Sequence, residues 1–118
     1  MKSNIPANFR TSHWYGVAKR ARIIYYNPKS MSADEAQGLN YEDLSNPKYS
    51  NSVVIRASSN TYNKSLVASL IANNGSSKTE KWAKGIVGNM ARDPKGNDRA
   101  QIMAVAAGKA KLAVANSY

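Results

Sequence analysis

Three short apolar runs along the chain predict the strands of a sheet. They occupy residues 23–26, 52–56 and 112–115. Asn27 and Pro28 follow the first run, which is typical of a strand that ends in a turn. The second run is apolar and rich in β-branched side chains, so we expect it to be the central strand.

Apolar residues spaced three and four positions apart predict three helices between the second and third strands. The first helix follows an N-cap at Ser59 or Asn60 and ends at Gly75, which suits a left-handed cap. The second helix precedes a loop at residues 93–98, and the third follows that loop and ends at Gly108. Strands that alternate with helices in this way predict an α/β fold with a mainly parallel sheet.

The length and composition of the chain are those of one ordinary domain. It has 118 residues, of which 42% are hydrophobic and 20% are charged. Domains commonly have about 100–150 residues, so we expect residues 1–118 to form a single domain. No cysteine is present, which excludes a disulfide scaffold, thiolate metal sites and thiol nucleophiles. The first residues are polar rather than apolar, so we expect no signal peptide within this chain.

The strong positive charge indicates an anionic partner. The sequence has 17 Lys and Arg against 7 Asp and Glu, a net charge of +10. Nucleic acid, a membrane surface and small anions all fit such a balance. The cationic residues are dispersed over the predicted helices, and only residues 19–22 lie close to several tyrosines, at positions 15, 25 and 26. Because two of these tyrosines belong to a predicted strand, nucleic-acid binding remains the less favoured alternative.

The chemistry needed for catalysis is scarce. The chain has one histidine and few carboxylates, and these are scattered over separate polar segments. It contains no Gly-x-Ser-x-Gly sequence, no P-loop and no Gly-x-Gly-x-x-Gly motif. We therefore predict that the protein is not an enzyme.

Polar segments follow the predicted strands or precede the predicted helices at three places. They are Ser-Ser-Asn-Thr-Tyr at 58–62, Gly-Asn-Asp at 96–98 and Asn-Ser-Tyr at 116–118. Each segment alone also suits an N-cap or a turn. Their convergence at one edge of an α/β sheet favours a ligand site, because ligands bind in the crevice beyond the carboxyl ends of the strands. The first amides of a helix at that edge can also hold an anion.

These segments, together with residues 19–27, 63–69, 81–85 and 104–108, resemble the ferric-iron substrate-binding proteins of bacterial ABC transporters, in particular the cyanobacterial-type branch. The resemblance covers nearly all of the chain, in order and with matching spacing. It implies the C-terminal lobe of a two-lobed, type II periplasmic binding protein, in three αβα layers around a mainly parallel sheet. It also implies a periplasmic location, delivery of Fe(III) to an ABC-transporter permease, and a second lobe that is absent from this chain.

The resemblance also implies which residues bind the ligand. Tyrosines hold the iron in this family, and two of them match Tyr62 and Tyr118; a further tyrosine would come directly after Tyr118. Relatives that bind a synergistic anion (carbonate, citrate or phosphate) hold it with serines and asparagines at strand and helix ends. Arg22 matches an arginine near the metal that does not bind it directly. The positions expected to bind the anion or to surround the metal are Ser58, Ser59, Asn60, Asn97, Asn116 and Arg22.

The chemistry of phenols agrees with such a site. Fe(III) favours anionic oxygen, a free phenol has a pKa of about 10, and a bound cation stabilises the phenolate. Nearby cationic side chains act in the same direction. Two tyrosines do not complete an octahedral coordination shell around the iron, so solvent, an anion or a second molecule must fill the remaining positions.

A small-anion binding module without metal is the first alternative function. The surface left open by the absent lobe also predicts self-association of the chain.

Overall fold

A single mixed sheet lies at the centre of the computed structural model, which describes residues 4–118. The strands are β1 (Arg22–Tyr26), β2 (Val53–Val54) and β3 (Leu112–Asn116), and their order across the sheet is β1-β3-β2. All five residues of β3 are buried. β3 is therefore the central strand, and the prediction that residues 52–56 form it is wrong.

The sheet is mixed rather than mainly parallel, which corrects a second prediction. β1 runs antiparallel to β3, with Arg22 opposite Asn116 and Tyr26 opposite Leu112. β2 runs parallel to β3 but pairs only through Val53 and Val54. The apolar pattern of a strand does not encode the direction of its neighbour, so the sequence could not reveal this arrangement. The α/β class itself is confirmed.

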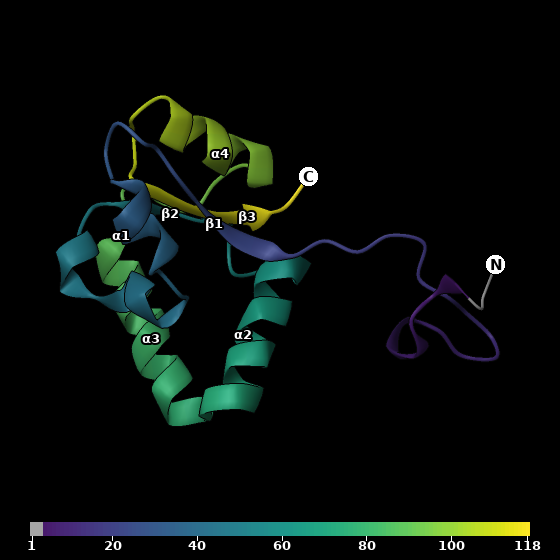
Figure 1. Ribbon diagram of the computed structural model, residues 1–118. Helices are drawn as coiled ribbons and strands as arrows, with labels where there is room; N and C mark the ends of the chain where they lie inside the picture. The colour runs from purple at the N-terminus through teal and green to yellow at the C-terminus, as the bar shows by residue number, and fades with distance from the viewer. Residues whose placement is uncertain (1–3) are drawn as a thin grey trace.

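Helices cover both faces of the sheet, so the body has three layers (Figure 1). Helix α2 (Thr61–Asn74) and helix α3 (Ser76–Asn89) lie on one face, and helix α4 (Asp98–Ala106) lies on the other. Side chains alternate across a strand. Leu112 and Val114 therefore pack in the core with α2 and α3, whereas Ala113 packs in the core with α4.

Two glycines explain how α2 and α3 fit together and against the rest of the chain. Gly75 joins the helices with a φ of 87°, a left-handed value that favours glycine, as the sequence predicted. Gly85 lies where α3 meets the connection between β1 and β2. A Cβ atom at position 85 would lie 2.7 Å from the Cβ of Ser45, so only glycine allows this approach.

Short helices fill the connection between β1 and β2. They are α1 (Ala33–Gln37) and two 3-10 helices, η3 (Glu42–Ser45) and η4 (Pro47–Tyr49). The side-chain amide of Asn89, at the end of α3, donates to the carbonyl groups of Leu44 and Asn46, both at 2.8 Å. This contact fixes the connection against α3.

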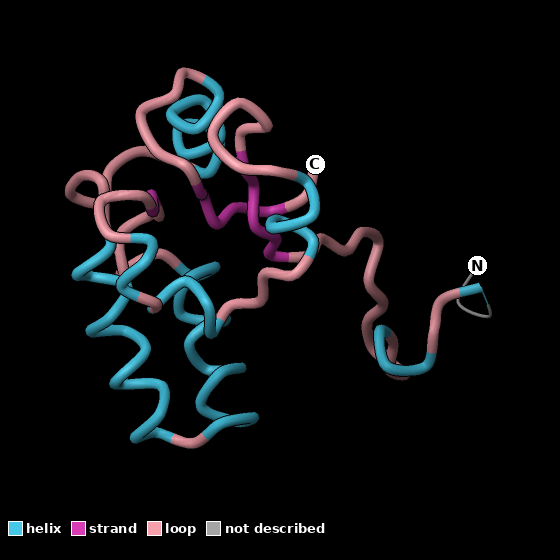
Figure 2. The backbone as a smooth tube through the Cα atoms, turned by 60° about the vertical axis from the view of Figure 1, so that its left-hand side comes forward, coloured by secondary structure: helices cyan, strands magenta, loops and turns pink. Residues whose placement is uncertain are grey.

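Residues 4–21 form an arm that extends away from the body (Figure 2). It begins with the 3-10 helix η2 (Ala7–Phe9) and continues as a small hairpin, in which the N–H of Thr11 donates to the Trp14 carbonyl. The N–H of Gly16 donates to the Phe9 carbonyl at 2.7 Å. Among residues 4–118, no helix is both long enough and apolar enough to cross a membrane.

Candidate functional site

A mostly buried arginine, Arg22, joins the ends of several elements at one edge of the sheet. Nη1 of Arg22 donates to Oδ2 of Asp98 at 2.6 Å and to Oδ1 of Asn116 at 3.0 Å. Its Nη2 donates to Oδ1 of Asn63 at 2.7 Å. The antiparallel register of β1 and β3 makes this possible, because it places Arg22 directly opposite Asn116. The network therefore links β1, β3, α2 and α4.

Asp98 is the only carboxylate in this network of described residues. It is the first residue of α4, its side chain is 0% exposed, and it accepts a hydrogen bond from the backbone N–H of Asn116 at 2.9 Å. A second arginine, Arg56, follows β2 and brings Nη1 to 3.7 Å from Oδ1 of Asp98. A buried carboxylate is tolerated only with such partners. Its place at a helix N-terminus adds a further favourable interaction.

Tyr62 lies beside this network, close to both arginines. It is the second residue of α2, and its backbone N–H donates to Oδ1 of the N-cap Asn60 at 3.0 Å. The guanidinium groups of Arg22 and Arg56 lie 5.7 Å and 5.5 Å from the centre of its ring. The residue is 41% exposed, so its phenol can reach a ligand.

A cavity of about 290 Å³ opens next to Tyr62. Arg22 and Asn116 also line it, so three of the residues predicted from the sequence come together here. Lys19 and Arg20, from the base of the arm, line the same cavity. The cavity therefore has a cationic wall and one phenol.

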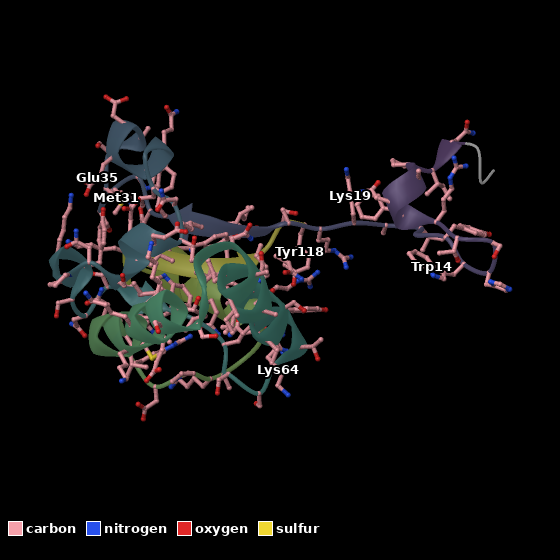
Figure 3. The ribbon with its side chains drawn as sticks, turned by 90° about the horizontal axis from the view of Figure 1, so that it is seen from below. Trp14, Lys19, Met31, Glu35, Lys64 and Tyr118 are labelled. Atoms are coloured by element: carbon pink, nitrogen blue, oxygen red, sulfur yellow. The ribbon has the colours of Figure 1, made fainter. Side chains whose placement is uncertain are left out.

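Tyr118, the second predicted ligand, is more exposed. It is 65% exposed and lies on the side of the body from which the arm leaves (Figure 3). The guanidinium groups of Arg20 and Arg99 lie 5.6 Å and 5.5 Å from the centre of its ring. The preceding residue, Ser117, is tied to Ala21 by two hydrogen bonds. Tyr118 does not line the cavity beside Tyr62.

The remaining predicted positions have local roles. Oδ1 of Asn97 accepts from the N–H of Ala100, which makes it the N-cap of α4, as Asn60 is the N-cap of α2. Ser58 lines a separate hollow between α2 and α3, and Ser59 lies in an exposed turn. The structure therefore groups Arg22, Tyr62 and Asn116, and leaves these four around them.

Sequence reasoning missed three residues of this network: Arg56, Asn63 and Asp98. One signal was present for Asn63, which shares the inward face of α2 with Leu66 and Leu70. A polar residue in an apolar stripe needs a buried partner. Here the Nδ2 of Asn63 donates to the carbonyl of Arg56 at 2.7 Å. Asp98 lies in the polar segment at 96–98 that the sequence placed at this edge, but it was not named as a site residue, and no local pattern singled out Arg56.

The donor set of the site is unusual for a metal site. Within residues 4–118, no group of three or more His, Cys, Asp or Glu residues could hold a metal ion. The side chains that line the Tyr62 cavity offer a phenol, an amide, a hydroxyl and three cationic groups. Such a set suits either an anion or a hard cation that arrives together with an anion.

A sheet between two helical layers, with a cationic cavity at one edge, suits a protein that binds an anionic ligand. A comparison with known protein families identifies the family. Residues 2–118 match the model of the bacterial extracellular solute-binding protein family, so the chain belongs to that family. It is 48% identical to iron uptake protein A1 of Synechocystis sp. over 120 residues, which is 100% of this chain and 33% of that protein.

Solved structures agree with this assignment. The chain resembles the IdiA (FutA) protein of Trichodesmium, solved in complex with iron and citrate, with a TM-score of 0.89 and 51% identity over 99% of this chain and 37% of the other. The chain also resembles the ferric binding protein of Campylobacter jejuni, with a TM-score of 0.86 and 45% identity over 97% of this chain and 36% of the other. The α/β lobe predicted from the sequence is thereby confirmed. The chain spans about a third of the length of these relatives.

Proposed function

We propose that this chain is part of a ferric-iron-binding protein that serves iron uptake through an ABC transporter. The observation that carries the proposal is Tyr62, a half-exposed phenol at a cationic cavity and beside two guanidinium groups. The relatives named for iron uptake and ferric binding match this chain at 45–48% identity. A relative that is 51% identical was solved with iron and citrate.

In this proposal Tyr62 and Tyr118 supply phenolate oxygens to Fe(III), the cargo of the protein. A bound Fe(III) stabilises the phenolate form of its ligands, so the scarcity of carboxylates is no obstacle. An anion of the carbonate, citrate or phosphate type completes the metal's coordination. Asn60 and Asn97 use their Oδ1 atoms as helix caps, so only their amide NH₂ groups remain to donate to an anion. Ser58, Ser59, Asn116 and Arg22 are the other proposed surrounding groups.

The proposed setting follows from the family. Residues 1–118 form one lobe, a second lobe closes over the iron, and the closed protein delivers its cargo to a permease in the periplasm. The family is one of extracellular solute-binding proteins, and such proteins are binding proteins rather than enzymes. Without the second lobe, self-association through the surface that it would cover is expected.

Titration with ferric citrate tests the proposal. A visible phenolate-to-iron charge-transfer band should appear in this chain, or in a longer form that includes the second lobe. Tyr62→Phe should remove most of the band and Tyr118→Phe a smaller part, because Tyr118 is held less firmly. Tyr15→Phe, an exposed tyrosine in the arm hairpin, is the matched control and should leave the band intact. Absence of the band in the longer form would refute the metal assignment.

A small-anion module without metal is the second candidate, favoured by the cationic wall of Lys19, Arg20 and Arg22. Binding of phosphate or sulfate with no charge-transfer band on iron addition would support it. Nucleic acid is less well supported, because Tyr25 and Tyr26 are half-buried and the hydroxyl of Tyr25 donates to the Asn116 carbonyl. These rings are not open platforms for base stacking.

A further inference from the structure

Arg22 and Arg56 share one carboxylate but are held by it very differently. Arg22 contacts Asp98 at 2.6 Å and also donates to Asn116, Asn63 and the Val114 carbonyl. Both of its terminal nitrogens are therefore committed to protein acceptors. Its side chain is 11% exposed. Arg22 is thus a fixed part of the scaffold, with little capacity left for a ligand.

The guanidinium group of Arg56, in contrast, is held only loosely by the protein. In its ion pair with Asp98, Nη1 lies 3.7 Å from Oδ1, which is too long for a hydrogen bond. Among the residues that the structure describes, its guanidinium group makes no hydrogen bond at all. A guanidinium has five N–H donors, so Arg56 retains nearly its full capacity. Its side chain is 23% exposed and also borders the hollow of about 350 Å³ between α2 and α3, which gives it room to move.

The position of Arg56 links this capacity to the site. Its guanidinium group lies 5.5 Å from the centre of the Tyr62 ring, on the polar segment that leads from β2 to α2. A carboxylate bound by Arg56 would therefore lie next to the proposed iron ligand. The planar fork of a guanidinium matches a carboxylate with two parallel hydrogen bonds.

We propose that Arg56, and not Arg22, contacts a carboxylate of the anion that accompanies the iron. The inference rests on the proposed function for the presence of iron, but the contact itself is with the anion. Arg56 exchanges its loose pairing with Asp98 for a hydrogen-bonded pairing with the ligand. Asp98 keeps Arg22 and the N–H of Asn116 throughout, so the exchange leaves no buried charge without a partner.

The test uses the iron-free chain, and citrate is the probe. Arginine side-chain NMR signals report which guanidinium group meets the anion, and calorimetry reports the affinity. Citrate should shift the Arg56 signals and leave those of Arg22 nearly unchanged. Arg56→Gln should weaken citrate binding at least about tenfold. Arg56→Lys, which keeps the charge and loses the fork, should give an intermediate loss.

Lys109→Gln is the matched control for charge. Lys109 is exposed in the turn before β3, at the opposite end of that strand from Asn116, and its loss should change the affinity by no more than about twofold. Thermal unfolding of each variant checks that it is folded. Should Arg56→Gln unfold the chain, the NMR comparison of Arg56 with Arg22 in the unaltered chain still decides.

The inference is overturned if citrate shifts Arg22 rather than Arg56, or if Arg56→Gln and Lys109→Gln bind citrate equally well. It is also overturned if citrate shifts neither arginine. None of these outcomes bears on the proposed function, which depends on the phenolate-to-iron band. Conversely, citrate contact with Arg56 in a protein that shows no such band would retain the anion contact and refute the iron assignment.

Discussion

Tyr62 and Tyr118 have similar charged neighbours, but they differ in how firmly the protein holds the arginines beside each ring. Each ring lies within 5.7 Å of two guanidinium groups, so the local electrostatic settings are alike. The arginines beside Tyr62 share the fully buried Asp98, and one of them is almost fully buried itself. The arginines beside Tyr118, Arg20 and Arg99, are both exposed and form no ion pair among the described residues.

This difference shows that equal distances do not mean equal preorganisation. Around Tyr62, hydrogen bonds to Asp98, Asn116 and Asn63 hold one of the two cations, Arg22, in one geometry. Around Tyr118, long exposed side chains lose conformational entropy in order to stay in place, and salt screens their charge. Tyr62 therefore belongs to a fixed half-site, whereas Tyr118 needs a ligand or further protein to fix it.

The largest expected effect comes from removing the shared carboxylate. Asp98→Ala leaves Arg22 buried without its counter-ion, which should lower the free energy of unfolding by about 3 to 5 kcal/mol. Urea denaturation followed by circular dichroism measures the change. Asp93→Ala, an exposed aspartate a few residues earlier, should cost less than about 0.5 kcal/mol. Equal losses in the two variants would show that the network does not stabilise this edge of the sheet.

A smaller effect is expected from a tyrosine that supports β1. The hydroxyl of Tyr41 donates to the Arg22 carbonyl, and burial raises the pKa of that phenol. Tyr41→Phe should lower the free energy of unfolding by about 1 kcal/mol, the usual value of one hydrogen bond. Tyr118→Phe should have no measurable effect on stability, since it is mostly exposed. A comparable loss in both variants would contradict the difference in support described above.

The smallest effect concerns an ion pair outside the network, between Glu35 and Lys48. A hydrogen bond from the Lys48 ammonium, at 2.8 Å, and a second from Tyr49 lower the pKa of Glu35 below its usual 4.5. Because the folded state has the lower pKa, the pair stabilises the fold above pH 4.5. This contribution disappears as the pH falls through the lowered pKa.

Unfolding midpoints of the unaltered chain and of Glu35→Gln, measured from about pH 6 to about pH 3, test this sign. The two curves should differ slightly at the upper end and converge at the lower end. The difference should also shrink in high salt, because the pair is solvent-accessible. A difference that grows as the pH falls would contradict the assignment of Lys48 as the main cause.

Local patterns in the sequence were enough for the elements and for part of the site. Asn60 caps α2 and Gly75 ends it, as the capping and turn chemistry predicted. The polar segments at 58–62, 96–98 and 116–118 do lie at the ends of elements around one edge of the sheet. The direction of β1 was not predictable, because it depends on pairing between Arg22 and Asn116, which are 94 residues apart.

The sequence by itself determined the α/β class, the helix ends, the cationic character and the position of Tyr62 at a helix start, because each depends on neighbouring residues. Only the tertiary structure decided which arginine is committed and which is available. That distinction arises because folding brings Asp98 to Arg22 across 76 residues and buries both, while Arg56 stays at the margin of the same carboxylate. Burial and hydrogen-bond satisfaction are properties of the packed chain, and no local pattern records them.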